Sequence, residues 1–243
     1  MKCIADLHNH TVASVHAYST VTECAQEAAE TGLEFLAITD HAPELPDGVN
    51  KLHFMNYHVL PKQICNVRML YGAELNILDY NGSLDLNESL CKKLDICIAS
   101  FHIFGLSPGS KAENTRAYLG AMQYPHVDII GHPDDGLVPV DFGELVKEAS
   151  KMHVMLEVNN SSLKAAYYRL NTRENIIEML KNCEQYGVNV AIGSDSHYHG
   201  AIGKFGEVIS LMEEIGFPEE LVVNTSAERL IEQLALRHPQ LKK

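Results

Sequence analysis

The chain has 243 residues, 46% of them apolar, and its 19 basic and 32 acidic side chains give a formal net charge of -13 at pH 7. This composition excludes a disordered polyelectrolyte, and the length is sufficient to bury the core of one large domain. The basic residues are scattered, and their only adjacent pairs are Lys92 with Lys93 and Lys242 with Lys243. The sequence therefore does not favour stable nucleic-acid binding.

The sequence contains no secretory or membrane signal that we recognise. The first apolar run meets Asp6 after three residues, and no later run approaches the ~18 residues of a membrane span. The six cysteines form no CxxC pair. These features predict a cytoplasmic protein with reduced thiols and no membrane association.

Short β-branched runs alternate with helical segments along the chain. A strand at residues 3–7 precedes a helix at 22–31, which Thr20 or Thr22 can cap at its start and Gly32 at its end. Further helices are predicted at 141–152 and at 172–186, the latter followed by Gly187. The remaining predicted strands are residues 35–39, 69–75, 96–99, 127–130, 154–158 and 188–192.

Strands separated by helices of this length are expected to be parallel, with right-handed crossovers. Seven or eight such units in one α/β domain predict a closed barrel, with an open doubly wound sheet as the alternative. The glycine-rich fingerprint of a dinucleotide site is absent after the first strand. Its absence favours the barrel.

The chain has 13 histidines and no tryptophan, and metal-ligand types follow six of the seven predicted strands. If the first strand stays extended, Asp6, His8 and His10 share one face. The metal-ligand types are His8, His10 and His16 after the first strand, His41 after the second, Glu74 at the end of the third, His102 after the fourth, His132 after the fifth, and Asp195 and His197 after the seventh.

The carboxyl ends of parallel barrel strands meet at one mouth, so these nine side chains are expected to converge. A cluster of imidazoles and carboxylates on one rim is unfavourable unless a positive ion holds it together. Three metal sites of three or four ligands each would account for all nine groups.

The segments DLHNH at 6–10, AITDH at 37–41, IIGHP at 129–133, EVNNSS at 157–162 and GSDSH at 193–197 resemble the PHP superfamily of polymerase and histidinol phosphatase domains. Within it, the chain looks most similar to the YcdX type of bacterial phosphatase. The resemblance covers nearly the whole chain, so residues 1–243 are expected to form one metal-dependent phosphoesterase domain. It implies a single-domain, distorted (β/α)7 TIM-like barrel.

The resemblance also implies a trinuclear centre that hydrolyses phosphomonoesters with a metal-activated hydroxide. Three divalent ions are expected, zinc first, with manganese or iron as alternatives. On the matching positions, His8, His10, Glu74 and Asp195 would hold one metal and the hydroxide. Glu74 would bridge to a second metal held by His102 and His132, and His16, His41 and His197 would hold the third.

Residues around the predicted ligands are candidates for supporting roles. Asp6 and Asp40 are candidates to accept ring N–H bonds from ligand histidines, although Asp6 fits a purely structural role equally well. Asn159 and Asn160 would either meet substrate or satisfy backbone groups. His199 is expected to be a solvated loop residue rather than a tenth ligand.

Several functions remain as alternatives: a nuclease acting on nucleotide ends, a histidinol phosphatase, an amidohydrolase or a metal-storage module. The amidohydrolase is disfavoured because residues 100–102 read Ser-Phe-His where that family usually has a bridging lysine. The predicted partner is a small phosphorylated substrate, and homo-oligomerisation is left open. Loops at 42–61 and 105–114 are expected to form the rim that selects the substrate's organic group.

Overall fold

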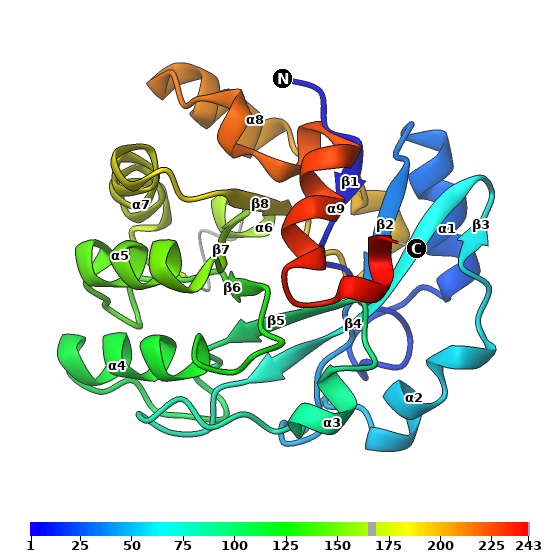
Figure 1. Ribbon diagram of the computed structural model, residues 1–243, viewed down its shortest axis with the longest axis horizontal. Coiled ribbons are helices and arrows are strands. Elements are labelled where there is room, and N and C mark those ends of the chain that lie inside the picture. The colour runs from blue at the N-terminus through cyan, green and yellow to red at the C-terminus, as the bar shows by residue number, and fades with distance from the viewer. Residues whose placement is uncertain (165–168, 243) are drawn as a thin grey trace.

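Seven parallel strands follow one another in chain order in the computed structural model, which describes residues 1–164 and 169–242 (Figure 1). The hydrogen-bonded order is β1-β2-β4-β5-β6-β7-β8, and the short β3 pairs antiparallel with β4. The strands are β1 Ala5–Asp6, β2 Phe35–Ile38, β3 Gln63–Ile64, β4 Val67–Asn76, β5 Ile96–Ser100, β6 Ile129–Gly131, β7 Met155–Asn159 and β8 Val190–Gly193.

Asn224 closes the gap between the first and last strands of the barrel. Its side-chain nitrogen donates to the carbonyls of Ala5 and Ile192, and its side-chain oxygen accepts from the Ile192 backbone nitrogen. Beyond the strands, the Asp195 nitrogen donates to the His8 carbonyl over 2.9 Å. The ends of β1 and β8 therefore lie together, and the barrel is nearly closed.

Helices surround the strands, with α4, α5, α7 and α8 lined up outside β5 to β8 in Figure 1. The helices are α1 Val21–Glu30, α2 Lys51–Met55, α3 Glu88–Cys91, α4 Lys111–Ala121, α5 Phe142–Met152, α6 Asn160–Lys164, α7 Thr172–Tyr186, α8 Gly206–Ile215 and α9 Ala227–Ala235. Short 3-10 turns are η1 Tyr57–Val59, η2 His199–Ala201, η3 Glu219–Leu221, η4 Val223–Thr225 and η5 Pro239–Lys242.

Local sequence signals explain where several helices begin and end. Thr20 caps α1 in a reciprocal capping box with Glu23, and Asp141 caps α5 through the Glu144 nitrogen. Helix α7 ends at Gly187, whose φ of 63° lies in the left-handed region that glycine adopts without strain.

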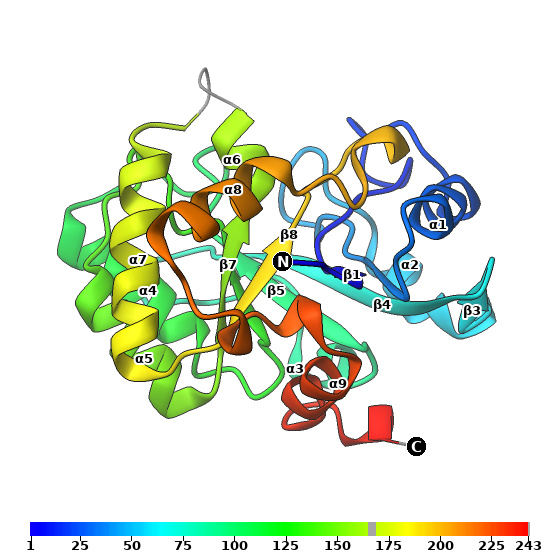
Figure 2. The same cartoon turned by 90° about the horizontal axis from the view of Figure 1, so that it is seen from above.

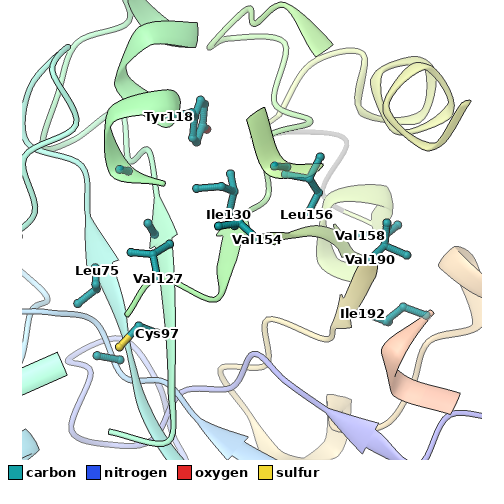
Figure 3. Packing of buried hydrophobic residues seen from close by; sticks show 14 of the residues in the cluster. Leu75, Cys97, Tyr118, Val127, Ile130, Val154, Leu156, Val158, Val190 and Ile192 are labelled. Atoms are coloured by element: carbon teal, nitrogen blue, oxygen red, sulfur yellow. The ribbon is translucent and has the colours of Figure 1, made fainter. Parts of the chain in front are cut away.

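The core has two layers. The outer layer lies between strands and helices and includes Val127, Ile130 and Leu156 (Figure 3). The inner layer fills the barrel, and Leu230 and Leu234 of α9 complete it. Figure 2 shows α9 on the side away from the arrowheads of β7 and β8. Helix α9 therefore covers the end of the barrel where the strands begin, which leaves the opposite mouth free.

The structure confirms the predicted α/β barrel of seven parallel strands and excludes the open sheet. Some boundaries differ from the prediction. Strand β1 ends at Asp6, one residue before the predicted end. The predicted rim loops are not entirely irregular, because the segment 42–61 contains α2 and the segment 105–114 contains the start of α4. The prediction also missed β3, a short hairpin partner of β4.

No helix in the described parts of the chain has the length and apolarity needed to cross a bilayer. All six cysteines are free thiols, of which Cys24, Cys91, Cys97 and Cys183 are buried.

Candidate metal centre

The nine predicted ligands come together at the carboxyl ends of the strands, beside a cavity of about 520 Å³. Most of them line it directly or lie just beneath it. The lining residues are His16, His41, Leu45, Pro46, Asp47, Glu74, His102, Phe104, His132, Arg169, Asp195 and His197.

Glu74, near the end of β4, lies at the centre of the cluster and is 1% exposed. Imidazole nitrogens of five histidines lie 2.8–3.6 Å from its two carboxylate oxygens. His8, His102 and His132 face Oε1. His10 and His41 face Oε2. A carboxylate in this position presents each oxygen to a different group of imidazoles, as a bridging ligand does.

Asp195 provides a second carboxylate on the same side as His8 and His10. Its Oδ1 lies 3.4 Å from His10 Nε2 and 3.8 Å from His8 Nε2. The Asp195 backbone has a φ of 51°, and that of His132 has a φ of 28°. Non-glycine residues rarely adopt these angles, and such strain is characteristic of functional sites.

Electrostatics keep the two carboxylates ionised. Burial opposes the charged form of Glu74, but the imidazoles of His102 and His8 outweigh burial and hold its pKa well below the usual range. Burial also disfavours the Asp195 carboxylate, but His8 and His10 lower its pKa well below the usual range. By contrast, burial and the neighbouring His41 lower the pKa of His10 to about 3, so its imidazole is neutral at pH 7.

The donor set fits metal ions. Buried atoms without a hydrogen-bond partner include His8 Nε2, both ring nitrogens of His10, His41 Nε2 and His197 Nε2. Leaving so many buried polar atoms unpaired is costly unless a ligand satisfies them. Groups of three donors within 4.8 Å of one another include His8, His10 and Glu74, and also His10, His41 and His197.

The outer part of the cluster brings in one residue that the sequence analysis had not assigned. His16 is about half exposed, and its Nδ1 lies 3.1 Å from Asp47 Oδ2. The three donors His16, His41 and Asp47 lie within 4.8 Å of one another. Asp47 belongs to the loop at 42–61. The sequence of such a long loop does not show which of its residues lies near the histidines.

Two further side chains orient candidate ligands. Glu157 Oε1 lies 2.7 Å from His8 Nδ1, and its Oε2 accepts from the His132 backbone nitrogen. Asn76 Oδ1 lies 2.7 Å from His102 Nδ1. These contacts direct the Nε2 atoms of His8 and His102 toward Glu74, a role typical of residues that support metal ligands.

Gly193 makes room for this arrangement. A Cβ at this position would lie 2.2 Å from Glu157 Oε1 and 2.6 Å from His8 Cβ. The glycine at the end of β8 is therefore required by the close approach of His8 and Glu157.

Asp6 and Asp40 do not contact the rings of the nine candidate ligands in the way that the sequence analysis expected. Asp6 accepts from the backbone nitrogens of Ser194 and Gly203. Asp6 therefore holds the segment after β8, whereas the His8 ring meets Glu157. Glu157 occupies the position expected of these aspartates.

Asp40 supports the backbone that carries the ligands. It accepts hydrogen bonds from the nitrogen and hydroxyl of Thr11 and from Ser14 Oγ. Its only imidazole contact among the described residues is with His53 Nε2, at 3.3 Å. Asp40 therefore binds the loop after His10 rather than a ligand ring.

The remaining candidates separate into two groups. Asn159 donates to Asp195 Oδ2, so it supports a proposed ligand, whereas Asn160 accepts from the backbone nitrogen of Val208. His199 pairs with Ser19 Oγ and belongs to none of the metal-ligand groups in the described structure.

Arg169 was missed by the sequence analysis. Its guanidinium lines the cavity and lies 3.3 Å from Asp195 Oδ2. A single arginine between a predicted strand and a predicted helix has no periodicity that signals this role. Glu157, in contrast, is an acidic residue within an apolar strand, and that anomaly was a usable signal.

Comparison with known proteins finds a family model and curated relatives that match nearly the whole chain. The family model described as PHP domain matches residues 6–233. A protein named probable phosphatase from Clostridium novyi (strain NT) is 44% identical over 234 residues, which cover 96% of this chain and 95% of the relative. One from Caldicellulosiruptor saccharolyticus, also named probable phosphatase, is 42% identical over 231 residues, covering 95% of each chain.

Solved structures share the fold at low sequence identity. Histidinol phosphate phosphatase from Lactococcus lactis, in complex with zinc, L-histidinol and phosphate, has a TM-score of 0.63 and 17% identity, covering 90% of this chain and 95% of that chain. A chain of archaeal ribonuclease P with mature tRNA has a TM-score of 0.62 and 15% identity, covering 98% and 93%. At this identity, both comparisons support the fold alone.

Proposed function

Because this chain belongs to the PHP domain family, we propose that it is a phosphatase that hydrolyses phosphate monoesters at a centre of three divalent metal ions. The curated relatives named probable phosphatase align along 95% or more of this chain. The observation that carries the proposal is the position of Glu74, whose carboxylate faces five imidazoles.

The ligands are assigned to three ions. His8, His10, Glu74 and Asp195 would hold one, Glu74 with His102 and His132 a second, and His16, His41 and His197 the third. The proximity of Asp47 to His16 and His41 makes this carboxylate an additional donor for the third ion. Zinc is the first choice for such imidazole-rich sites, and manganese and iron are alternatives.

Divalent ions bound there would neutralise phosphate charge and lower the pKa of a bound water toward about 7. The protein's own residues supply positioning. Glu157 and Asn76 fix the rings of His8 and His102, so that their Nε2 atoms point to the same carboxylate. Orientation of this kind avoids reorganisation when the substrate reacts.

Arg169 and the cavity walls indicate the substrate class. The guanidinium is held by Asp195 and Ser162 on the cavity surface, where it can donate to a phosphate oxygen. Leu45, Pro46 and Phe104 offer apolar contacts for an organic group. A volume of about 520 Å³ suits a small phosphorylated molecule.

The test compares aryl phosphate monoesters and diesters with the purified, metal-loaded protein. We expect faster turnover of the monoester, loss of activity after dialysis against a chelator, and recovery when divalent metal is restored. Glu74→Gln, prepared in the same way, controls for a contaminating phosphatase. Preference for the diester would contradict the substrate class, and chelator-resistant turnover would contradict the metal requirement.

A panel of phosphomonoesters would then identify the organic group. Histidinol phosphate belongs in this panel because the Lactococcus lactis structure contains L-histidinol and phosphate. Nucleotides with a terminal phosphate belong there as well, since they test action on nucleotide ends.

A further inference from the structure

A second group of metal-ligand types lies among the strand starts, at the end of the barrel opposite the cavity. Cys97 is near the start of β5, Asp128 directly precedes β6, and His238 lies in the segment between α9 and η5. One ligand atom from each residue lies within 4.8 Å of the other two. Their exposed fractions are 0%, 2% and 0%.

We propose that Cys97, Asp128 and His238 bind a divalent transition-metal ion, zinc by preference, at a site separate from the phosphatase centre. The three residues come from distant parts of the chain, and only folding brings them together. The site does not depend on the proposed phosphatase activity, because it shares no residue with that centre.

Hydrogen bonds within this cluster leave some of its possible metal-ligand atoms without a partner. Asp128 Oδ2 already has two partners, the Cys97 backbone nitrogen at 2.8 Å and His238 Nε2 at 2.9 Å. Asp128 Oδ1 and His238 Nδ1 are buried without a hydrogen-bond partner. Since buried carboxylate oxygens are nearly always paired, the unpaired Asp128 Oδ1 points to a missing partner within this cluster.

His126 provides a further imidazole at the edge of the group. Its ring centroid lies 5.6 Å from that of His238, and its Nδ1 is also buried without a partner. The ring of His126 is only partly buried. It is therefore the cluster member nearest to solvent and a candidate fourth ligand.

The chemistry of the donors suits zinc. Thiolate, imidazole and carboxylate are all zinc ligands, and a structural site usually has four protein ligands, which His126 would complete here. Soft sulfur also selects against magnesium and calcium, which prefer oxygen ligands. Figure 3 shows Cys97 among the outer core residues, near Leu75 and Val127. An ion held in this dry surrounding would be structural rather than catalytic.

Such an ion would attach the end of the chain to the barrel. Helix α9 packs its leucines into the inner core layer, and His238 follows it directly. An ion that joins His238 to Cys97 of β5 and to Asp128 before β6 would hold α9 against this end of the barrel. Binding to the folded state alone adds stability in proportion to affinity and ion concentration.

Cobalt(II) gives a direct test, because cobalt bound to thiolate shows a near-ultraviolet charge-transfer band. The proposed phosphatase ligands include no cysteine, so cobalt bound there produces no such band. We expect the folded wild-type protein to develop the band when titrated with cobalt, and Glu74→Ala to retain it. Absence of the band in wild type would overturn the proposal and leave Asp128 and His238 as a simple hydrogen-bonded pair.

Variants identify the ligands. Cys97→Ser should abolish the band and lower cobalt content by about one ion per chain, as expected for one structural site. His238→Gln should weaken cobalt binding at this site. Cys183→Ser is the matched control, since Cys183 is also buried but belongs to no group of ligands in the described structure. Equal bands in Cys97→Ser and wild type would refute the assignment.

Discussion

Both carboxylate oxygens of Glu157 accept hydrogen bonds or face imidazoles around the candidate metal centre. One oxygen holds the His8 ring and the other accepts from the backbone of His132 and the side chain of Asn159. Burial opposes protonation of His8, but the charges of Glu157 and Glu74 raise its pKa well above the usual range. Glu157 therefore positions the ring of a proposed ligand and favours positive charge at His8.

Glu157→Gln is expected to weaken metal affinity by about 10- to 100-fold, as for other residues that support metal ligands. The amide replaces one acceptor with a donor, so either His8 or the His132 backbone loses its partner. Metal titration with a competing indicator measures the change. Glu214→Gln, at an exposed position on α8, is the control. Unchanged affinity in Glu157→Gln would contradict the positioning role.

Asp40→Asn is expected to act on stability instead. Burial disfavours the charged form of Asp40, but hydrogen bonds from His53, Thr11 and Ser14 outweigh it and lower the pKa to about 2. The carboxylate is therefore ionised, and an amide would misdirect the bonds from Thr11 and Ser14. We expect a loss of about 1 to 3 kcal/mol in unfolding free energy, measured by denaturant titration. A fully stable variant with impaired metal binding would instead assign Asp40 to the metal site.

At the level of elements, the sequence predicts those strands whose apolar runs are bounded by helices and by the histidine motifs. It also predicts α1, α5 and α7, because capping residues and glycine mark their ends. Short helices such as α2 and α3 lack enough length to show a period. Strand β3 depends on pairing with β4, which no local pattern reveals.

The junction of β1 and β8 is the weakest point of the barrel in hydrogen bonding, and Asn224 bridges it. Asn224→Ala is expected to lower the free energy of unfolding by roughly 2 to 4 kcal/mol, because several buried backbone groups lose their partner. Denaturant unfolding measures the effect. Asn182→Ala is the control, since that side chain lies on the surface of α7. Equal stabilities would show that Asn224 does not close the barrel.

For the whole molecule, parallel strands explain why the site was predictable. Each strand end was recognisable locally, and barrel topology then required all nine candidate ligands to meet at one mouth. Arg169 and the grouping of Cys97, Asp128 and His238 could not be predicted this way. Arg169 lies outside the strand ends, and the three residues of the second cluster are joined only by folding.

Metal content per chain tests the central claim, a three-ion centre in which Glu74 serves two ions. The comparison uses wild type, Glu74→Ala and His41→Ala after dialysis against a weak chelator, with exposed His58→Ala as the control. Elemental analysis should show a loss of about two ions for Glu74→Ala and about one for His41→Ala, given three open sites of this type. Equal losses from the two variants, or about one ion or fewer in the wild-type protein, would contradict the account.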